Sequence, residues 1–371
     1  MKNNIIFPAV CDIPKKAASS LLLLFLFLTV ILCAGGCEGR SENTYEFLSR
    51  YDRDIEYFPE KKWSKLTSPQ LAGWSIAKLE EARRYSENIH SGSVLIVENG
   101  VIIAEWGPTT TRYKLHSVRK SLMSAMYGIH VAKQEISLAS ALQDLKITDI
   151  GGLSIKEQQA TVYDLITSRS GIYHAAAYET EGMRRKRPAR YSSDPGTRWY
   201  YNNWDFNALL TIFNQQTKKD FFEQFRQEIA TPLQMEHLRV QDMNYHYELN
   251  ISSHPAYLFR MSALDLARFG LLYLRQGRWR DQQIIPAEWV RESTKKHMVF
   301  KPKNPEKGYG YLWWINKGAY YASGNGGQLL LIAPDSNLVI VHCADTDKGV
   351  RVKSDQAWIL FDKILHAREV K

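Results

Sequence analysis

The stretch from His116 to His130 constrains the fold of this chain more than any other segment. Apolar residues recur along it at steps of three and four, the spacing of one helix face: Val118, Leu122, Ala125, Met126 and Ile129. Met123 and Tyr127 make the other side apolar as well. We therefore expect a helix that begins near Ser117 and is buried on most of its sides.

Ser117 and Lys120 stand one turn apart at the start of this helix, so their side chains share a face. A serine hydroxyl becomes a useful nucleophile when a neighbouring base takes its proton. A lysine can be that base if burial and the positive end of the helix dipole lower its pKa. The pair therefore indicates nucleophilic catalysis. The alternative is a serine that only starts the helix, beside a solvated lysine.

The same Ser-x-x-Lys spacing occurs twice more, beginning at Ser75 and at Ser293. Ser75 is better explained as the N-cap of the amphipathic helix that follows it. Ser293 lies in a polar, lysine-rich segment without an apolar helix behind it. Only Ser117 opens an apolar helix, so we expect the nucleophile there.

The first 36 residues have the pattern of an export signal. Two lysines precede the uncharged apolar run Leu21–Cys33, which is short for a membrane span but fits a signal-peptide core. Small residues and then Cys37 follow, and this segment resembles a bacterial lipobox, in which the cysteine becomes the lipidated first residue. We predict a signal peptide over 1–36 and a lipoprotein anchored at Cys37 in a bacterial cell envelope, facing the periplasm or exterior. The alternatives are ordinary signal-peptidase cleavage and an uncleaved membrane anchor.

Charge and cysteine content narrow the functional classes. The formal net charge of +9 is mostly scattered, which favours solubility over nucleic-acid binding. Behind the signal segment only Cys37 and Cys343 remain, so no internal disulfide framework is expected. None of the ten histidines is paired at a metal-ligand spacing, so we expect no metal and no cofactor. The basic run Arg184–Arg190 indicates a solvated loop or, alternatively, a rim that selects anionic substrates.

Strand patterns stand at both ends of the chain, around a helical middle. Ser93–Glu98 and Val101–Trp106 flank Asn99-Gly100, the turn pair of a tight hairpin. Residues 135–292 are mostly helical in pattern. Four strand patterns and a closing helix follow, at residues 309–315, 320–323, 328–333, 338–343 and 354–367.

This order predicts an α+β fold, in which helices cover an antiparallel sheet built from both chain ends, with an inserted helical lobe over about 135–292. Residues 37–70 show little periodicity, and we predict a tether and N-terminal extension there. Residues 71–371 form the predicted main domain.

Three motifs resemble, in order, those of the penicillin-recognising serine hydrolases. Ser117-x-x-Lys120 resembles the first, and a Pro-Gly turn followed by Tyr201-x-Asn203 resembles the second. The run from Gly324 to Gln328 falls where the family has Lys-Thr-Gly or His-x-Gly on an inner strand. The chain is most similar to class C β-lactamases and to related esterases, D-amino-acid peptidases and aminohexanoate-oligomer hydrolases. The resemblance implies their β-lactamase/transpeptidase-like fold.

The resemblance also implies a role for each residue of the first two motifs. Ser117 would attack a carbonyl and form an acyl-enzyme, and Lys120 would take or relay its proton. Tyr201 would act as general base, which requires a lowered pKa or a proton shared with Lys120. Asn203 would orient Lys120 or the substrate. Without the flanking motifs, the alternative is that Tyr201 is simply part of an aromatic core.

The third motif is expected to bind the substrate. The backbone N–H groups of Ser117 and Gln328 would form the oxyanion hole. Gly327 and the other glycines beside Asn325 would let the strand approach the substrate closely. The alternative is that this glycine run is only a hairpin turn.

Asn325 stands where the relatives carry a lysine or histidine that helps to hold a substrate carboxylate. Its replacement favours a neutral ester or amide substrate, or another source of positive charge. We therefore expect an exported serine hydrolase that acts on a small-molecule ester or amide. The alternatives are a D-amino-acid peptidase or weak β-lactamase, and a penicillin-binding or peptidoglycan-sensing protein without turnover. The sequence leaves the oligomeric state open.

Overall fold

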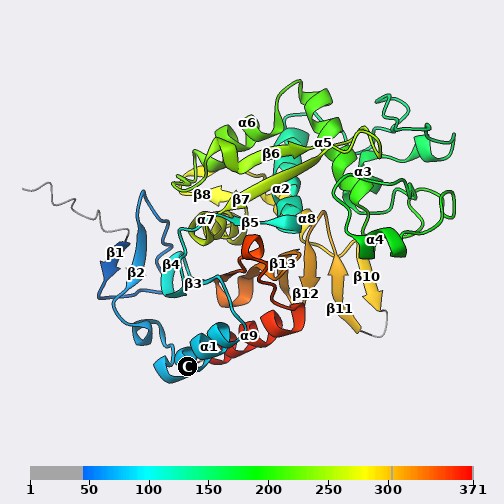
Figure 1. Ribbon diagram of the computed structural model, residues 1–371. Coiled ribbons are helices and arrows are strands. Elements are labelled where there is room, and N and C mark those ends of the chain that lie inside the picture. The colour runs from blue at the N-terminus through cyan, green and yellow to red at the C-terminus, as the bar shows by residue number, and fades with distance from the viewer. Residues whose placement is uncertain (1–44, 302–303, 370–371) are drawn as a thin grey trace, which may run out of the picture. The chain divides into compact units, whose positions relative to one another are not determined.

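The computed structural model describes residues 45–301 and 304–369. Within this part of the chain, the main element is a ten-stranded sheet (Figure 1). Across the sheet, the strands are β1 (Tyr45–Leu48), β2 (Trp63–Leu66), β4 (Val101–Trp106), β3 (Ser93–Glu98), β15 (Leu338–Cys343), β14 (Gln328–Ala333), β13 (Ala319–Gly324), β12 (Trp314–Asn316), β11 (Asn304–Tyr309) and β10 (Met298–Lys301). The pairing of β3 with β15 joins the two chain ends, as predicted.

The sheet is antiparallel from β4 to β10, whereas β1, β2 and β4 pair in parallel. No strand is predicted for residues 37–70, yet β1 and β2 extend the sheet there. Each has only four residues, too few for a clear alternation. The Asn99-Gly100 hairpin forms as expected, with φ angles of 52° and 84° at its two turn residues.

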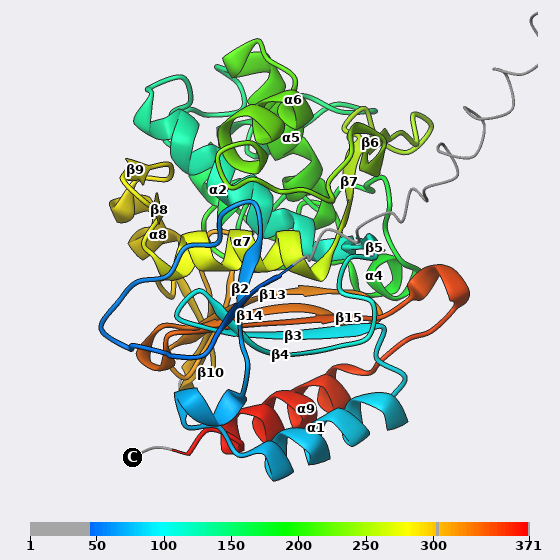
Figure 2. The same cartoon turned by 90° about the vertical axis from the view of Figure 1, so that its left-hand side faces the viewer.

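Helices cover both faces of the sheet (Figure 2). On one face, α1 (Ile76–Asn88) packs beside α9 (Ser354–His366), and Val94 and Ile96 of β3 join their apolar cluster. On the other face, α7 (Ala263–Leu274) crosses β14, β15 and β3. This contact is close, because a Cβ atom on Gly270 would lie 2.6 Å from the Val339 side chain. Although α7 falls within the predicted helical lobe, it covers the main sheet.

The remaining elements lie beyond α7 or at its ends. The helices among them are α2 (Arg119–Ala132), α3 (Val162–Ile166), α4 (Glu181–Lys186), α5 (Asn203–Thr217), α6 (Phe221–Phe225) and α8 (Ala287–Ser293). The strands are β5 (Tyr113–Lys114), β6 (Met243–His246) and β7 (Ala256–Met261), which form a small sheet, and the hairpin of β8 (Arg278–Trp279) and β9 (Gln282–Gln283). The region predicted as helical therefore also contains strands.

Two sequence-based predictions need comment here. The expected strand over 309–315 is interrupted, because the chain turns where Gly310 N–H donates to the Trp313 carbonyl and Leu312 adopts a φ of 62°. The predicted signal peptide, 1–36, and Cys37 lie outside the described residues.

No helix within residues 45–301 and 304–369 is long and apolar enough to cross a membrane.

Candidate active site

Ser117 lies in a 3₁₀ turn, His116–Val118, that leads directly into α2. The next helix residues, from Arg119 to His130, are all buried, which confirms the expected buried helix. The end of β13 reaches this turn because Gly324 has no side chain. A Cβ atom there would lie 2.3 Å from the Leu115 carbonyl oxygen. The backbone approach of β13 therefore depends on glycine at this position.

Lys120 is the centre of the polar contacts beside Ser117. Its side chain is 2% exposed. The Lys120 Nζ atom lies 2.8 Å from Ser117 Oγ, 2.8 Å from Tyr201 Oη and 3.1 Å from Asn203 Oδ1. The structure thus brings together the four residues that the first two motifs singled out.

Burial sets the protonation of this group. It lowers the pKa of Lys120 well below its usual value, and the charge of Arg119 acts in the same direction. Burial also raises the pKa of Tyr201 to about 12, against the opposing effects of the Ser117 hydrogen bond and Arg119. The Lys120 amine therefore loses its proton at a lower pH than an exposed lysine does, and the Tyr201 phenol keeps its proton at neutral pH. A lowered tyrosine pKa was one of two expected routes to catalysis, and the direction of the shift contradicts it.

The other expected route is a proton shared between Lys120 and Tyr201. It depends on the hydrogen bonds that a deprotonated lysine can make. The amine has two N–H donors and one lone pair. The Asn203 Oδ1 atom only accepts, so one N–H points to it. The second N–H and the lone pair are left for the hydroxyls of Ser117 and Tyr201. Lys120 can thus accept a proton from one hydroxyl while it donates to the other.

Asn203 and Tyr201 are both held by packing. Asn203 is the first residue of α5, and its Nδ2 donates to the Tyr178 carbonyl at 3.3 Å, which directs Oδ1 toward Lys120. The Tyr201 ring stacks on Trp314, with centroids 5.5 Å apart and planes 27° apart. Tyr201 therefore belongs to an aromatic cluster and to the polar site at once, so the two readings of this residue do not exclude each other.

Arg119 is a buried cation beside the site that the motif comparison did not single out. It is 1% exposed, and its guanidinium lies 4.6 Å from the Tyr257 ring centroid and 5.8 Å from that of Tyr178. Among the described residues, neither Nε nor Nη2 of Arg119 has a hydrogen-bond partner. Its charge thus disfavours a second positive charge on Lys120.

We expect Arg119→Met to move the acid limb of the pH–rate profile to higher pH. In the role that the motifs predict for Lys120, that of a base, activity depends on the deprotonated amine and is lost as pH falls through the pKa of that lysine. Removing the neighbouring positive charge raises this pKa, so protonation begins at higher pH. The measurement is kcat/KM for one ester across pH, with Arg119→Lys as the charge-retaining control. An unchanged acid limb in folded Arg119→Met would show that the charge has no such effect.

A cavity of about 530 Å³ opens beside Ser117 and Tyr201. Its other lining residues come from β12, the β13–β14 hairpin and the segment before α9: Trp314, Ser323, Gly324, Asn325, Gly326, Gly327, Leu329, Arg351, Val352, Lys353 and Ser354. Asn325 is exposed in the hairpin turn, and Gly326 and Gly327 have φ angles of 85° and 100°. The glycine run is therefore a hairpin turn that also lines the cavity.

Gln328 points away from this cavity. Its side chain is fully buried, and Nε2 donates to the Ala344 carbonyl at 2.7 Å. The side chain thus fixes the start of β14. The oxyanion role assigned to its backbone N–H stays a prediction.

Arg351 and Lys353 line the cavity, although the motif comparison did not select them. They lie in the loop before α9, far in sequence from the three motifs, and no local pattern marks them.

The basic run Arg184–Arg190, by contrast, forms ion pairs with acidic side chains. The first three residues of the run end helix α4, so the prediction of a loop is wrong for them. Arg187 pairs with Glu179 and Arg190 with Glu157 at 2.7 Å, which leaves these two arginines less available to an anionic substrate.

The competing serines have structural contacts. The Ser75 hydroxyl accepts from the Lys78 backbone N–H at the start of α1, as expected for an N-cap. Ser293 is buried at the end of α8, where its hydroxyl donates to the Val290 carbonyl.

His116 is next to Ser117 in the chain, and its Nε2 atom lies 2.9 Å from the Thr346 hydroxyl. Burial lowers its pKa to about 4, with Arg351 acting in the same direction.

Comparison with known proteins identifies the family and the fold. The family model described as "Beta-lactamase" matches residues 76–362. An uncharacterized protein of Alkalihalophilus pseudofirmus is 22% identical over 293 residues, which cover 67% of this chain and 82% of that relative.

Two solved structures share the fold. A putative 6-aminohexanoate-dimer hydrolase from Bacillus anthracis has a TM-score of 0.61 and 19% identity, covering 86% of this chain and 88% of its own. An octameric penicillin-binding protein homologue from Pyrococcus abyssi has a TM-score of 0.60 and 17% identity, covering 78% and 77%. The predicted α+β, β-lactamase/transpeptidase-like fold is therefore confirmed. Because the family model spans well over half of the chain, this protein belongs to the β-lactamase family.

Proposed function

We propose that the protein hydrolyses an ester or amide through an acyl-enzyme on Ser117. The observation that carries this proposal is the 2.8 Å contact between Ser117 Oγ and the buried amine of Lys120. A neutral lysine at that distance can accept the serine proton as the hydroxyl attacks. A solvated, charged lysine could not, which argues against a mere helix-start serine.

Acylation and deacylation can be written as steps in which every proton has a donor and an acceptor. Ser117 Oγ bonds to the carbonyl carbon as its proton moves to Lys120 Nζ. The resulting oxyanion would be held by the N–H of Ser117, which has no intrahelical partner at the start of a helix, and by that of Gln328. As the oxyanion collapses, the C–O or C–N bond to the leaving group breaks. Tyr201 would give its proton to the leaving group and regain one from Lys120. Water then attacks the acyl group by the reverse transfers, which releases the acid and restores Ser117.

A substrate panel tests this proposal. It comprises p-nitrophenyl acetate and butyrate, D-alanyl peptides and nitrocefin. We expect steady-state turnover of at least one ester. A burst of acylation without a steady state would favour the alternative of a non-turnover penicillin-binding or sensing protein.

We expect Asn325→Lys to shift the balance of substrates toward β-lactams. Asn325 carries no charge for a carboxylate and is exposed in the hairpin turn of the cavity, so a lysine there adds a cation without burial. The measurement is the ratio of kcat/KM for nitrocefin to that for p-nitrophenyl acetate. Asn325→Gln is the uncharged control. Wild-type nitrocefin turnover above that of every ester would contradict the ester preference.

Arg351 and Lys353 give a specific reason to keep a second candidate, a D-amino-acid peptidase or weak β-lactamase. Both line the cavity and supply the positive charge that Asn325 lacks. This candidate requires that Arg351→Ala raise KM for carboxylate-bearing peptides and leave KM for neutral esters unchanged. Equal effects on both substrate classes would remove it.

We also propose that the protein is exported and anchored through lipidated Cys37. The apolar run and the small residues before that cysteine support this proposal. We expect Cys37→Ser to release the protein from membranes or to block its processing. Fractionation of the variant with membranes at the normal processed mass would contradict lipidation.

A further inference from the structure

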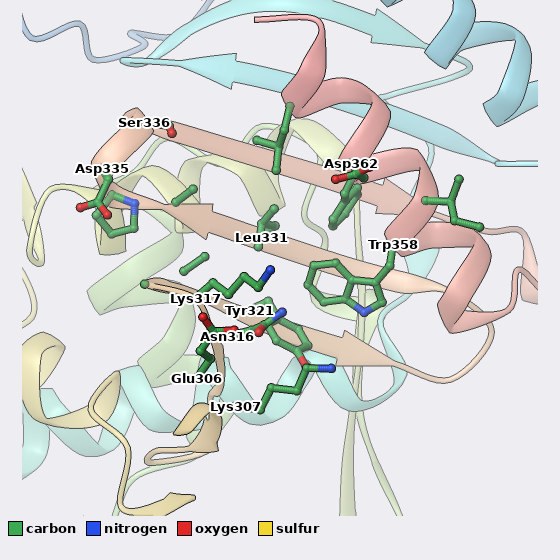
Figure 3. Close-up of a pocket in the computed structure, with 17 residues that line it drawn as sticks. Glu306, Lys307, Asn316, Lys317, Tyr321, Leu331, Asp335, Ser336, Trp358 and Asp362 are labelled. Carbon is green, nitrogen blue, oxygen red and sulfur yellow. The ribbon is translucent and has the colours of Figure 1, made fainter. Parts of the chain in front are cut away.

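A second and larger cavity, of about 790 Å³, lies on the same face of the sheet as α9 (Figure 3). It opens where α9 leaves β11–β14 uncovered. Figure 3 shows Leu331, Tyr321 and Trp358 gathered in it, with Asp335 and Ser336 toward one end. No motif of the sequence leads into this cavity, and the steps proposed above do not use it.

The two cavities follow one another along the same elements. On neighbouring strands, Ser323 pairs with Leu329 and Tyr321 pairs with Leu331. The first pair lines the cavity of Ser117, and the second pair lines the larger cavity. Residues two apart on a strand point to the same face, so the second pair continues the surface of the first.

The helix and the aromatic side chains give the same continuity. Ser354 lines the first cavity and Trp358, one turn later on α9, lines the second. Tyr321 stacks on Trp314 at 6.3 Å and meets the Trp358 ring edge-on at 4.8 Å. Trp314 in turn stacks on Tyr201. Aromatic surface therefore extends from the proposed catalytic tyrosine into the larger cavity.

The larger cavity is lined by apolar and charged side chains, and the charged ones are exposed to solvent. Its inner surface is formed by Tyr321, Leu331, Trp358 and Phe361, and the ring systems offer broad apolar contact. Its charged residues have both signs, for example Lys317 and Asp362, so they select no single charged ligand. Leu331 and Phe361 are almost completely buried, so Tyr321 and Trp358 supply more of the accessible apolar surface, which suits contact with an apolar ligand.

We propose that the two cavities form one substrate groove, whose larger part binds an extended apolar chain of the ester or amide. This inference rests on the proposed function of Ser117. From Ser323 to Ala319, the groove follows four residue steps of β13, or about 13 Å at the usual rise of a strand. The chain can belong to the acyl group or to the alcohol, because both present the same apolar surface.

The test compares chain lengths in wild type and in Ala319→Trp. Ala319 lines only the larger of these two cavities, so the indole occupies part of that cavity and leaves Ser117 untouched. Ala77→Trp, on the exposed side of α1, is the matched control. One arm uses p-nitrophenyl acetate, butyrate, octanoate and dodecanoate below micelle formation. The other arm uses butyl and dodecyl acetates. Binding of dodecanoate and dodecanol to Ser117→Ala is measured calorimetrically.

We expect kcat/KM to rise with chain length in at least one arm for wild type and Ala77→Trp. In Ala319→Trp, the ratio of the longest to the shortest substrate should fall at least about tenfold, the low end of what one methylene contributes in an apolar pocket. Acetate turnover should stay unchanged. Flat chain-length profiles, or a profile that Ala319→Trp does not alter, would overturn the groove while leaving the proposed function intact.

If no ester is turned over, the binding measurement still decides. Binding of dodecanoate or dodecanol that Ala319→Trp abolishes supports the groove even where the proposed reaction fails. Lack of binding of both overturns it.

Discussion

Ser117→Ala is expected to abolish turnover of p-nitrophenyl acetate to the background rate. The substitution removes the oxygen that is proposed to form the acyl-enzyme, together with the proton that Lys120 is proposed to accept. Ser117 lies in a turn and is half-buried, so the loss of one hydroxyl should not prevent folding. The measurement is the steady-state rate, with the melting temperature of each protein alongside.

Ser75→Ala and Ser293→Ala are the matched controls, because each begins another Ser-x-x-Lys match. Both should keep near-wild-type turnover. Ser75→Ala should lose about 1 kcal/mol of stability with its N-cap. Near-normal turnover by folded Ser117→Ala would contradict the mechanism, whatever the controls show.

Lys120→Met is expected to lower kcat/KM by about 10² to 10⁴, the usual contribution of a general base. Methionine has a similar length and tolerates burial, so the packing against Phe206 and Tyr201 is largely kept. The variant removes the lone pair that accepts the Ser117 proton. Because Tyr201, with its raised pKa, holds its proton at neutral pH, it cannot replace the lysine as base.

Tyr201→Phe provides the comparison for this prediction. It keeps the ring stack on Trp314 and removes only the hydroxyl that contacts Lys120. We expect a smaller loss than for Lys120→Met, because the base remains. Both variants are measured on one ester, at the same pH, with melting temperatures. A larger loss in Tyr201→Phe than in Lys120→Met would return the role of base to the tyrosine.

Local patterns in the sequence predict much of the fold. The Asn99-Gly100 turn, the apolar helix behind Ser117 and the strands 328–333 and 338–343 each depend on residues close together in the chain, and all form as expected. β1 and β2 were missed because short edge strands are fixed by their neighbours in the sheet, not by their own periodicity.

The candidate site was likewise predicted only in part from the sequence. Motif spacing identified Ser117, Lys120, Tyr201 and Asn203, and the fold brings them into contact. The pKa shifts of Lys120 and Tyr201 could not be predicted from the sequence. The burial that causes both shifts comes from distant segments such as β12. Arg351 was missed for the same reason, since only the folded chain carries it to the cavity.

The most direct test of the account is to locate the covalent intermediate. One sample of the wild-type protein is treated with a labelled fluorophosphonate. A second sample reacts with an ester, and the reaction is quenched with acid. Both samples are digested, and the peptides are analysed by mass spectrometry. We expect a single adduct in each case, on the peptide that contains Ser117. An adduct on a different residue, or ester turnover without any adduct at Ser117, would contradict it.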